Sequence, residues 1–142
     1  MTTGKLAADI ERDEGRERAA YQDSRGYWTI GVGHLIDGRR GGGISDAIID
    51  AILQEDIATK KAQLTDQIPW WTTLDDVRQD ALVNMAFNLG VDGLLQFEHF
   101  LGALHAGDYA SAAASMMQSL WAKQVGQRAV RLHDMILTGK PS

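Results

Sequence analysis

Apolar residues recur at helical spacing over most of this chain, and the first such stretch lies near the N-terminus. Leu6 and Ile10 are four positions apart, so they share one face of a helix. Gly15 is suited to end that helix, which we predict over residues 3–14. Glu14 occupies the next position of the same apolar stripe. The pattern therefore places a carboxylate where an apolar side chain would be due.

The following segment has the pattern of a β-hairpin. Residues 23–26 read Asp-Ser-Arg-Gly, a composition typical of a tight turn. Residues 27–32 are rich in strand formers and predict a strand. The stretch 37–43 contains four glycines and two arginines, which predicts a surface loop. We therefore expect a small lobe with a hairpin over residues 15–44.

Apolar positions return to helical spacing from Ser45 onward. A connecting helix over residues 45–65 would be about 30 Å long, enough to link two lobes. Pro69 interrupts the pattern, and Thr73 with Asp76 then resembles a capping box. Further helices are predicted over residues 73–89, 97–105, 109–121 and 127–137.

These elements predict an α+β fold class with one domain over residues 1–142. The small N-terminal lobe and a helical C-terminal lobe over residues 66–142 are expected to border a ligand cleft. Gly90 is expected to end the helix that begins at Thr73. Trp70 and Trp71 are adjacent, so only one of them can be buried on regular structure.

Composition narrows the function classes. The chain has 142 residues, no cysteine and a net charge of −5. The absence of cysteine excludes a disulfide scaffold, a thiolate zinc site and a cysteine nucleophile. The negative charge disfavours a nucleic-acid partner. Residues 116–142 carry four basic residues against one acidic residue, which suits contact with an anionic polymer or simply decorates a helix end. The N-terminus lacks the long apolar stretch of a signal peptide, so we expect a cytoplasmic product.

Two carboxylates and a hydroxyl are the strongest candidates for chemistry. Glycoside hydrolysis needs one carboxylic acid to protonate the leaving oxygen and a second carboxylate to activate water. Glu14 on its apolar stripe is suited to keep a proton, whereas Asp23 at a solvated turn should stay ionised. Thr29 lies on the next strand, and a hairpin that folds back over the first helix would bring the three together.

The motifs around these residues closely resemble those of the phage-type lysozymes (endolysins), glycoside hydrolase family 24. Glu14, Asp23 and Thr29 stand at the family's spacing and are followed by Ile-Gly-Val-Gly-His over residues 30–34. The segment Asn-Met-Ala-Phe-Asn-Leu-Gly over residues 84–90, Trp121 and the Arg-Ala-Val-Arg element at residues 128–131 resemble later family elements.

The resemblance implies a lysozyme-like fold and cleavage of the β-1,4 bond between N-acetylmuramic acid and N-acetylglucosamine in peptidoglycan. It implies Glu14 as the general acid, with Asp23 and Thr29 holding the attacking water, and no metal or cofactor. It also implies an ion pair between His34 and Asp56 on the connecting helix. We expect further residues to bind substrate, namely Leu35, Phe87, Asn88, Gln124 and Arg128.

Several of these residues have a second interpretation. Leu35, Phe87 and Phe97 are suited to line the cleft, but each is also suited to a plain core position. Arg128 is suited to clamp substrate or, as we favour, to pair with Glu14. Asn84 shares a helix face with Asn88, and either binds acetamido groups or satisfies nearby backbone.

Three other functions fit parts of the sequence. A tail-associated wall-degrading lysozyme would use the same chemistry. A lytic transglycosylase would need no water, so Asp23 and Thr29 argue against it. A non-catalytic wall-binding module would not need the triad. For an endolysin, we expect a monomer that stays in the host cytoplasm until a holin permeabilises the membrane, and then acts on periplasmic peptidoglycan.

Overall fold

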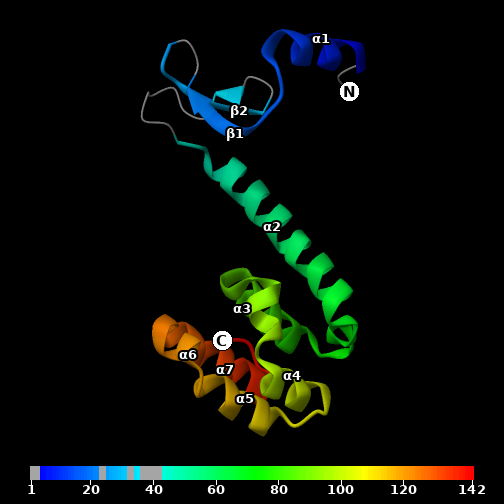
Figure 1. Ribbon diagram of the computed structural model, residues 1–142, viewed down its shortest axis with the longest axis vertical. Coiled ribbons are helices and arrows are strands. Elements are labelled where there is room, and N and C mark those ends of the chain that lie inside the picture. The colour runs from blue at the N-terminus through cyan, green and yellow to red at the C-terminus, as the bar shows by residue number, and fades with distance from the viewer. Residues whose placement is uncertain (1–3, 23–24, 32–33, 36–42) are drawn as a thin grey trace. The chain divides into compact units, whose positions relative to one another are not determined.

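A computed structural model describes residues 4–22, 25–31, 34–35 and 43–142 (Figure 1). The chain divides into two compact units, Met1–Ile52 and Leu53–Ser142. The first unit contains all of the described strands and the second is helical. The predicted α+β class is therefore confirmed.

The first unit combines a helix with a small antiparallel sheet. Its elements, in chain order, are α1 (Gly4–Glu14), β1 (Glu17–Gln22), β2 (Trp28–Gly31) and β3 (His34–Leu35). β2 lies between β1 and β3 and pairs antiparallel with both. The predicted hairpin is present, and β3 adds a strand that the sequence pattern did not predict. The predicted turn residues Asp23 and Ser24 and the predicted loop at 37–42 lie outside the described residues.

Helix α2 (Asp46–Gln67) begins in the first unit and ends in the second. The Ser45 hydroxyl accepts a hydrogen bond from the Ile48 amide at 3.3 Å, so Ser45 caps the helix, as predicted. The helix ends just before Pro69, which opens the 3-10 helix η1 (Pro69–Thr73). Proline fixes its own φ and has no amide hydrogen, so it suits the first turn of a new helix.

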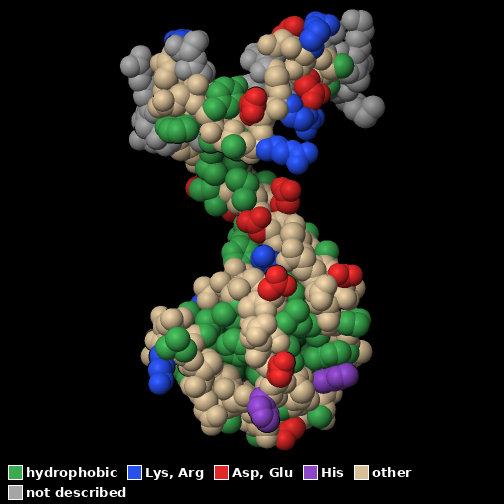
Figure 2. Space-filling model, viewed as in Figure 1, with side chains coloured by type: hydrophobic (Ala, Val, Ile, Leu, Met, Phe, Trp, Pro, Cys, Tyr) green, Lys and Arg blue, Asp and Glu red, His purple; other side chains and the backbone are tan. Residues whose placement is uncertain are grey.

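The second unit is a cluster of helices around one hydrophobic core. Its remaining elements are α3 (Asp76–Leu95), α4 (Glu98–His105), α5 (Tyr109–Met117), α6 (Leu120–Val125) and α7 (Gln127–Thr138). Helices α2, α3, α4, α5 and α7 each contribute to the core a side chain that is at most 1% exposed. These side chains are Leu64, Leu82, Phe100, Met116 and Ile136, in that order. Hydrophobic side chains also reach the surface of this unit, as the space-filling view shows (Figure 2). No helix in the described part of the chain is both long and apolar enough to cross a membrane.

Three helix boundaries differ from the prediction. The cap of α3 is Asp75, whose carboxylate accepts from the Arg78 amide at 3.2 Å, and not Thr73. Thr73 instead donates its hydroxyl hydrogen to the Trp70 carbonyl at 2.7 Å within η1. Gly90 breaks α3, with φ 74° and ψ 157°, but the chain resumes a helical path as far as Leu95.

The third difference is the helix predicted over residues 109–121, which is two helices. Ser119 separates α5 from α6 and caps α6, because its hydroxyl accepts from the Ala122 amide at 3.1 Å. Serine hydroxyls readily bond to nearby backbone groups, which favours serine at helix caps over helix interiors. The adjacent tryptophans behave as expected: Trp71 is 4% exposed, whereas Trp70 is half-buried and stacks on His105 with ring centroids 4.4 Å apart.

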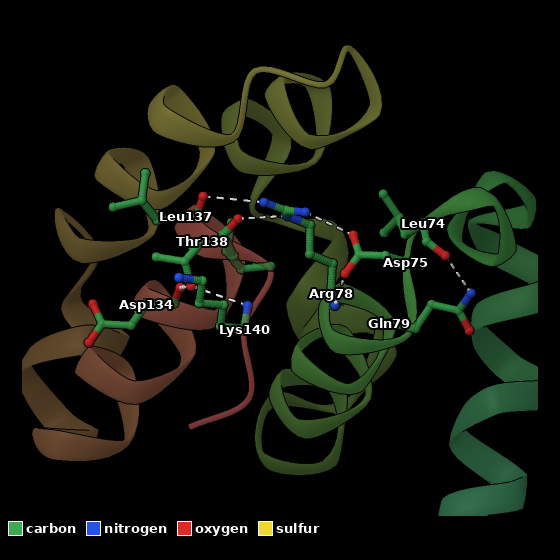
Figure 3. A network of polar contacts seen from close by, with 9 residues as sticks. Leu74, Asp75, Arg78, Gln79, Asp134, Leu137, Thr138 and Lys140 are labelled. Carbon is green, nitrogen blue, oxygen red and sulfur yellow. Dashed lines mark hydrogen bonds and ion pairs between the residues drawn. The ribbon is translucent and has the colours of Figure 1, made fainter.

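Arg78 fastens α3 to the C-terminal end of α7 (Figure 3). Its guanidinium donates to the carbonyls of Ile136 at 2.7 Å and Leu137 at 3.2 Å, and to the Asp75 carboxylate at 2.9 Å. The carbonyls in the last turn of a helix have no partner within the helix, and a cation is favourable there. The same guanidinium lies 3.5 Å from the ring centroid of Tyr109. Arg78 thus joins three helices at one point.

Candidate active site

The described residues include one complete side chain of the predicted catalytic triad, that of Thr29. Thr29 lies on β2 and is 4% exposed. Its hydroxyl donates to the Tyr27 carbonyl at 3.2 Å, so its only hydrogen is engaged and its lone pairs remain to accept. In the sheet Thr29 lies opposite Tyr21 on β1 and Leu35 on β3. The sheet therefore holds this hydroxyl in a fixed place as an acceptor.

Glu14 is the last residue of α1, and its side chain lies outside what the structure describes, as does Asp23. Gly15 follows Glu14 with φ 79°, a backbone conformation that favours glycine, and its amide donates to the Glu11 carbonyl at 2.7 Å. Arg16 forms an ion pair with Glu11, and the hydrogen bond and charge of Arg16 lower the pKa of the Glu11 carboxyl. The backbone at Gly15 thus ends α1, and the ion pair between Glu11 and Arg16 lies next to this end.

The predicted substrate-binding residues fall in both units. Leu35 lies on β3 in the first unit and is 45% exposed. In the second unit, Phe87, Arg128 and Asn84 line a cavity of about 460 Å³ bordered by α2, α3 and α7. Asn88 and Gln124 are exposed on α3 and α6 and are not among the residues that line this cavity.

Another cavity of this unit is about 490 Å³ and lies between α2 and the break in α3. Its lining includes Lys60, Asp66 and Asp92, together with Gly90. The sequence motifs did not indicate this cavity, whose lining includes the kink at Gly90. Within the described residues, no group of three or more histidine, aspartate or glutamate side chains is arranged to hold a metal ion.

Two polar contacts to asparagine residues of α3 were not predicted. Arg128 donates from Nε to Asn84 Oδ1 at 2.8 Å and from Nη2 to the Asn84 carbonyl at 3.2 Å. Trp121 donates from Nε1 to Asn88 Oδ1 at 2.8 Å. These partners are 44 and 33 positions apart, so local spacing carried no signal for them. The favoured pairing of Arg128 with Glu14 stays a prediction, because the Glu14 side chain is not described.

Phe97 is a core residue. It precedes α4, is half-buried, and contacts Phe100 and Trp121 edge to face, with ring centroids 6.4 and 6.0 Å apart. Trp121 is 5% exposed, so this aromatic cluster anchors the indole whose N–H reaches Asn88. The core therefore fixes a polar contact at the surface of α3.

Comparison with known proteins places the chain in a family. The profile of the family described as phage lysozyme matches residues 11–134. The pre-baseplate central spike protein of Enterobacteria phage T4 is 33% identical over 159 aligned positions, which cover 94% of this chain but 28% of the spike protein. The probable T4-type lysozyme 1 of Dictyostelium discoideum is 29% identical, with 92% of each chain covered.

The endolysin of Acyrthosiphon pisum secondary endosymbiont phage 1 is 36% identical over 119 positions, which cover 84% of this chain and 80% of the endolysin. The match thus spans most of two lysozyme-like relatives and a minor part of the spike protein. The family profile covers the segment with Glu14, Asp23 and Thr29 as well as the helical unit. This chain belongs to the phage lysozyme family of peptidoglycan-hydrolysing enzymes.

Proposed function

We propose that this chain hydrolyses the β-1,4 bond between N-acetylmuramic acid and N-acetylglucosamine in peptidoglycan, with inversion at the anomeric carbon. The observation that carries the proposal is the family match over residues 11–134, within which Glu14, Asp23 and Thr29 keep the spacing of a glycosidase acid and its water-holding partners. We propose further that residues 1–142 act as one catalytic domain.

In the proposed mechanism Glu14 donates its proton to the leaving glycosidic oxygen while a water attacks the anomeric carbon. Asp23 accepts a proton from that water, and the new bond forms on the face opposite the leaving group. Thr29 accepts a hydrogen bond from the water, because its own hydrogen is engaged by the Tyr27 carbonyl. The Glu14 and Asp23 carboxyls should then be about 6.5–9.5 Å apart, which leaves room for the water.

The proposal places substrate contacts on Leu35, Phe87, Asn88, Gln124 and Arg128. As an endolysin, the protein would act as a monomer and would need a holin-type partner to reach the wall from the host cytoplasm. The similarity to a phage spike protein keeps a second role in view, a tail-associated lysozyme with the same chemistry. Production in a bacterial cytoplasm without a permeabilising partner tests the need for a holin: the cells should stay intact, and prompt lysis would show another route to the wall.

The test of the proposed acid is Glu14→Gln, which keeps the shape of the side chain but removes the acidic proton. We expect dye release from labelled peptidoglycan to fall about a hundredfold to ten-thousandfold, with an unchanged circular dichroism spectrum. Glu17→Gln is the matched control, because Glu17 lies three residues away on β1, exposed to solvent, and should keep full activity. A Glu14→Gln variant within about threefold of the original protein would contradict the assignment.

A further inference from the structure

Two asparagine side chains on one face of α3 are each held by a donor from another helix. Asn84 and Asn88 are four positions apart and so lie one above the other on that face. Arg128 at the start of α7 donates to Asn84 Oδ1, and Trp121 on α6 donates to Asn88 Oδ1, both at 2.8 Å. Each amide is thus attached through its oxygen.

The chemistry of the two donors determines which way the amides point. An indole N–H and a guanidinium carry hydrogens and no acceptor, so only the oxygen of an amide can face them. The nitrogen of each asparagine must therefore point to the other side. Among the described residues, Nδ2 of neither asparagine donates a hydrogen bond. The face presents NH2 groups and no free amide oxygen.

The surroundings of these NH2 groups are partly apolar. Both asparagines are exposed, and Phe87 between them is 39% exposed. Asn84 and Phe87 line the cavity of about 460 Å³ together with Ile57 and Val83. A group that suits this surface has a hydrogen-bond acceptor next to a small apolar part. An acetamido group has both, a carbonyl oxygen and a methyl group.

We propose that Trp121 and Arg128 are positioning residues that lock the amides of Asn88 and Asn84 with their NH2 groups outward, so that this face of α3 binds acetamido carbonyl oxygens of a glycan strand. The inference rests on the proposed function for its substrate, since glycan strands of peptidoglycan carry acetamido groups. A free amine at the same position of the sugar would bring donors against donors and lose these bonds. The face therefore discriminates acetylated from deacetylated strands.

The sharpest test replaces each NH2 by oxygen while keeping the atom that Trp121 or Arg128 contacts. Asn88→Asp and Asn84→Asp do so, and in Asn84→Asp the retained oxygen becomes a charged partner for Arg128. Both variants should keep the unfolding temperature of the original protein or exceed it. Gln96→Glu, at the C-terminal cap of the same helix, is the matched control for the added negative charge.

The main measurement compares KM and kcat on native peptidoglycan and on enzymatically N-deacetylated peptidoglycan. The original protein should show a KM about tenfold higher on the deacetylated substrate, the loss typical of a few unmade hydrogen bonds. Each Asp variant should have a KM raised about tenfold on native substrate and should lose most of the discrimination, with kcat changed much less. Gln96→Glu should retain it.

Trp121→Phe tests the positioning role, because it keeps an aromatic ring in the core but removes the N–H that orients Asn88. The freed amide can rotate and present its oxygen, so KM on native substrate should rise by about twofold to fivefold and discrimination should weaken. A merely structural role for Trp121 would lower the unfolding temperature without changing the ratio of the two KM values. That result would overturn the positioning role.

A titration with an N-acetylglucosamine tetramer, followed by NMR of the α3 amides, separates this inference from the proposed function. The tetramer should shift the amide signals of Asn84 and Asn88 in the original protein, and more weakly in the Asp variants. Hydrolysis of peptidoglycan with unchanged KM and discrimination in both Asp variants would overturn the inference and leave the function standing. If the protein did not hydrolyse peptidoglycan but the tetramer still shifted the signals in a way that depends on the two amides, only the function would be overturned. If the tetramer caused no shift in the original protein, the inference would be overturned.

Discussion

The arginine that joins α3, α5 and α7 offers a direct test of how the helical unit is held together. Arg78→Met keeps most of the aliphatic stem and removes the guanidinium. It leaves the carbonyls of Ile136 and Leu137 without their donor, and it removes the contact over the Tyr109 ring. Because the side chain of Arg78 is 11% exposed, water cannot simply replace all of these contacts.

The expected loss follows from the contacts one by one. A hydrogen bond from a charged donor contributes about 1.5–3 kcal/mol, and Arg78 makes two to carbonyls. The pair with Asp75 adds less than about 1 kcal/mol, since the Asp75 side chain is 41% exposed. Contributions within one network do not add, and the solvated end of α7 recovers part of the loss. We therefore expect Arg78→Met to lower the free energy of unfolding by about 3 kcal/mol, or the unfolding temperature by about 10 °C.

Urea unfolding followed by circular dichroism measures this loss. Arg78→Lys keeps the charge but lacks the planar fork, so it should lose about half as much. Arg131→Met on the exposed face of α7 is the matched control and should change stability by less than about 0.5 kcal/mol. A loss below about 1 kcal/mol for Arg78→Met would refute the view that these contacts hold α7 in place.

Two further predictions concern the same network. Gly139→Ala should lower the free energy of unfolding in urea by about 2 kcal/mol, because φ at Gly139 is 68° and a Cβ there would lie 2.8 Å from Arg78 Nη1. The control is Gly107→Ala, where φ is 78° but the space is open, and this variant should lose about half as much. Equal losses in the two variants would contradict the role of the clash. At Asp75, burial acts to raise the pKa of the carboxyl, but the hydrogen bonds and charge from Arg78 outweigh it and hold the pKa below its ordinary value of 3.8. The folded pKa is depressed, so this stabilisation is complete above that value and is lost as pH falls through the folded pKa; Asp75→Asn should flatten the fall of stability in acid, and an unchanged acid profile would show that Asp75 contributes nothing to it.

Local sequence rules predicted most of the helices and one strand pairing, because caps, prolines and glycines act within a few residues. They failed at α3, where both Thr73 and Asp75 are good caps and the choice depends on a distant contact. Arg78 binds Asp75 and the end of α7 at once, which favours the later start. The rule for Gly90 predicted the break correctly but not that the helix resumes beyond it.

The candidate site also has a part that local sequence patterns predict and a part that depends on the fold. The spacing of Glu14, Asp23 and Thr29 is a local pattern, and the sequence carries it in full. The side-chain contacts of Asn84 and Asn88 depend on donor residues that are 44 and 33 positions away along the chain, respectively, so only the fold brings the donors to them. The burial of Thr29 likewise follows from its central strand, which the alternation of residues alone did not indicate.

Mass analysis of the muropeptides released from purified peptidoglycan tests the central claim most directly. Hydrolysis by a water held at Asp23 and Thr29 predicts fragments that end in reducing N-acetylmuramic acid, heavier by one water than the anhydro form, and none from the Glu14→Gln variant. Fragments that end in 1,6-anhydro-N-acetylmuramic acid would show a transglycosylase and contradict the account.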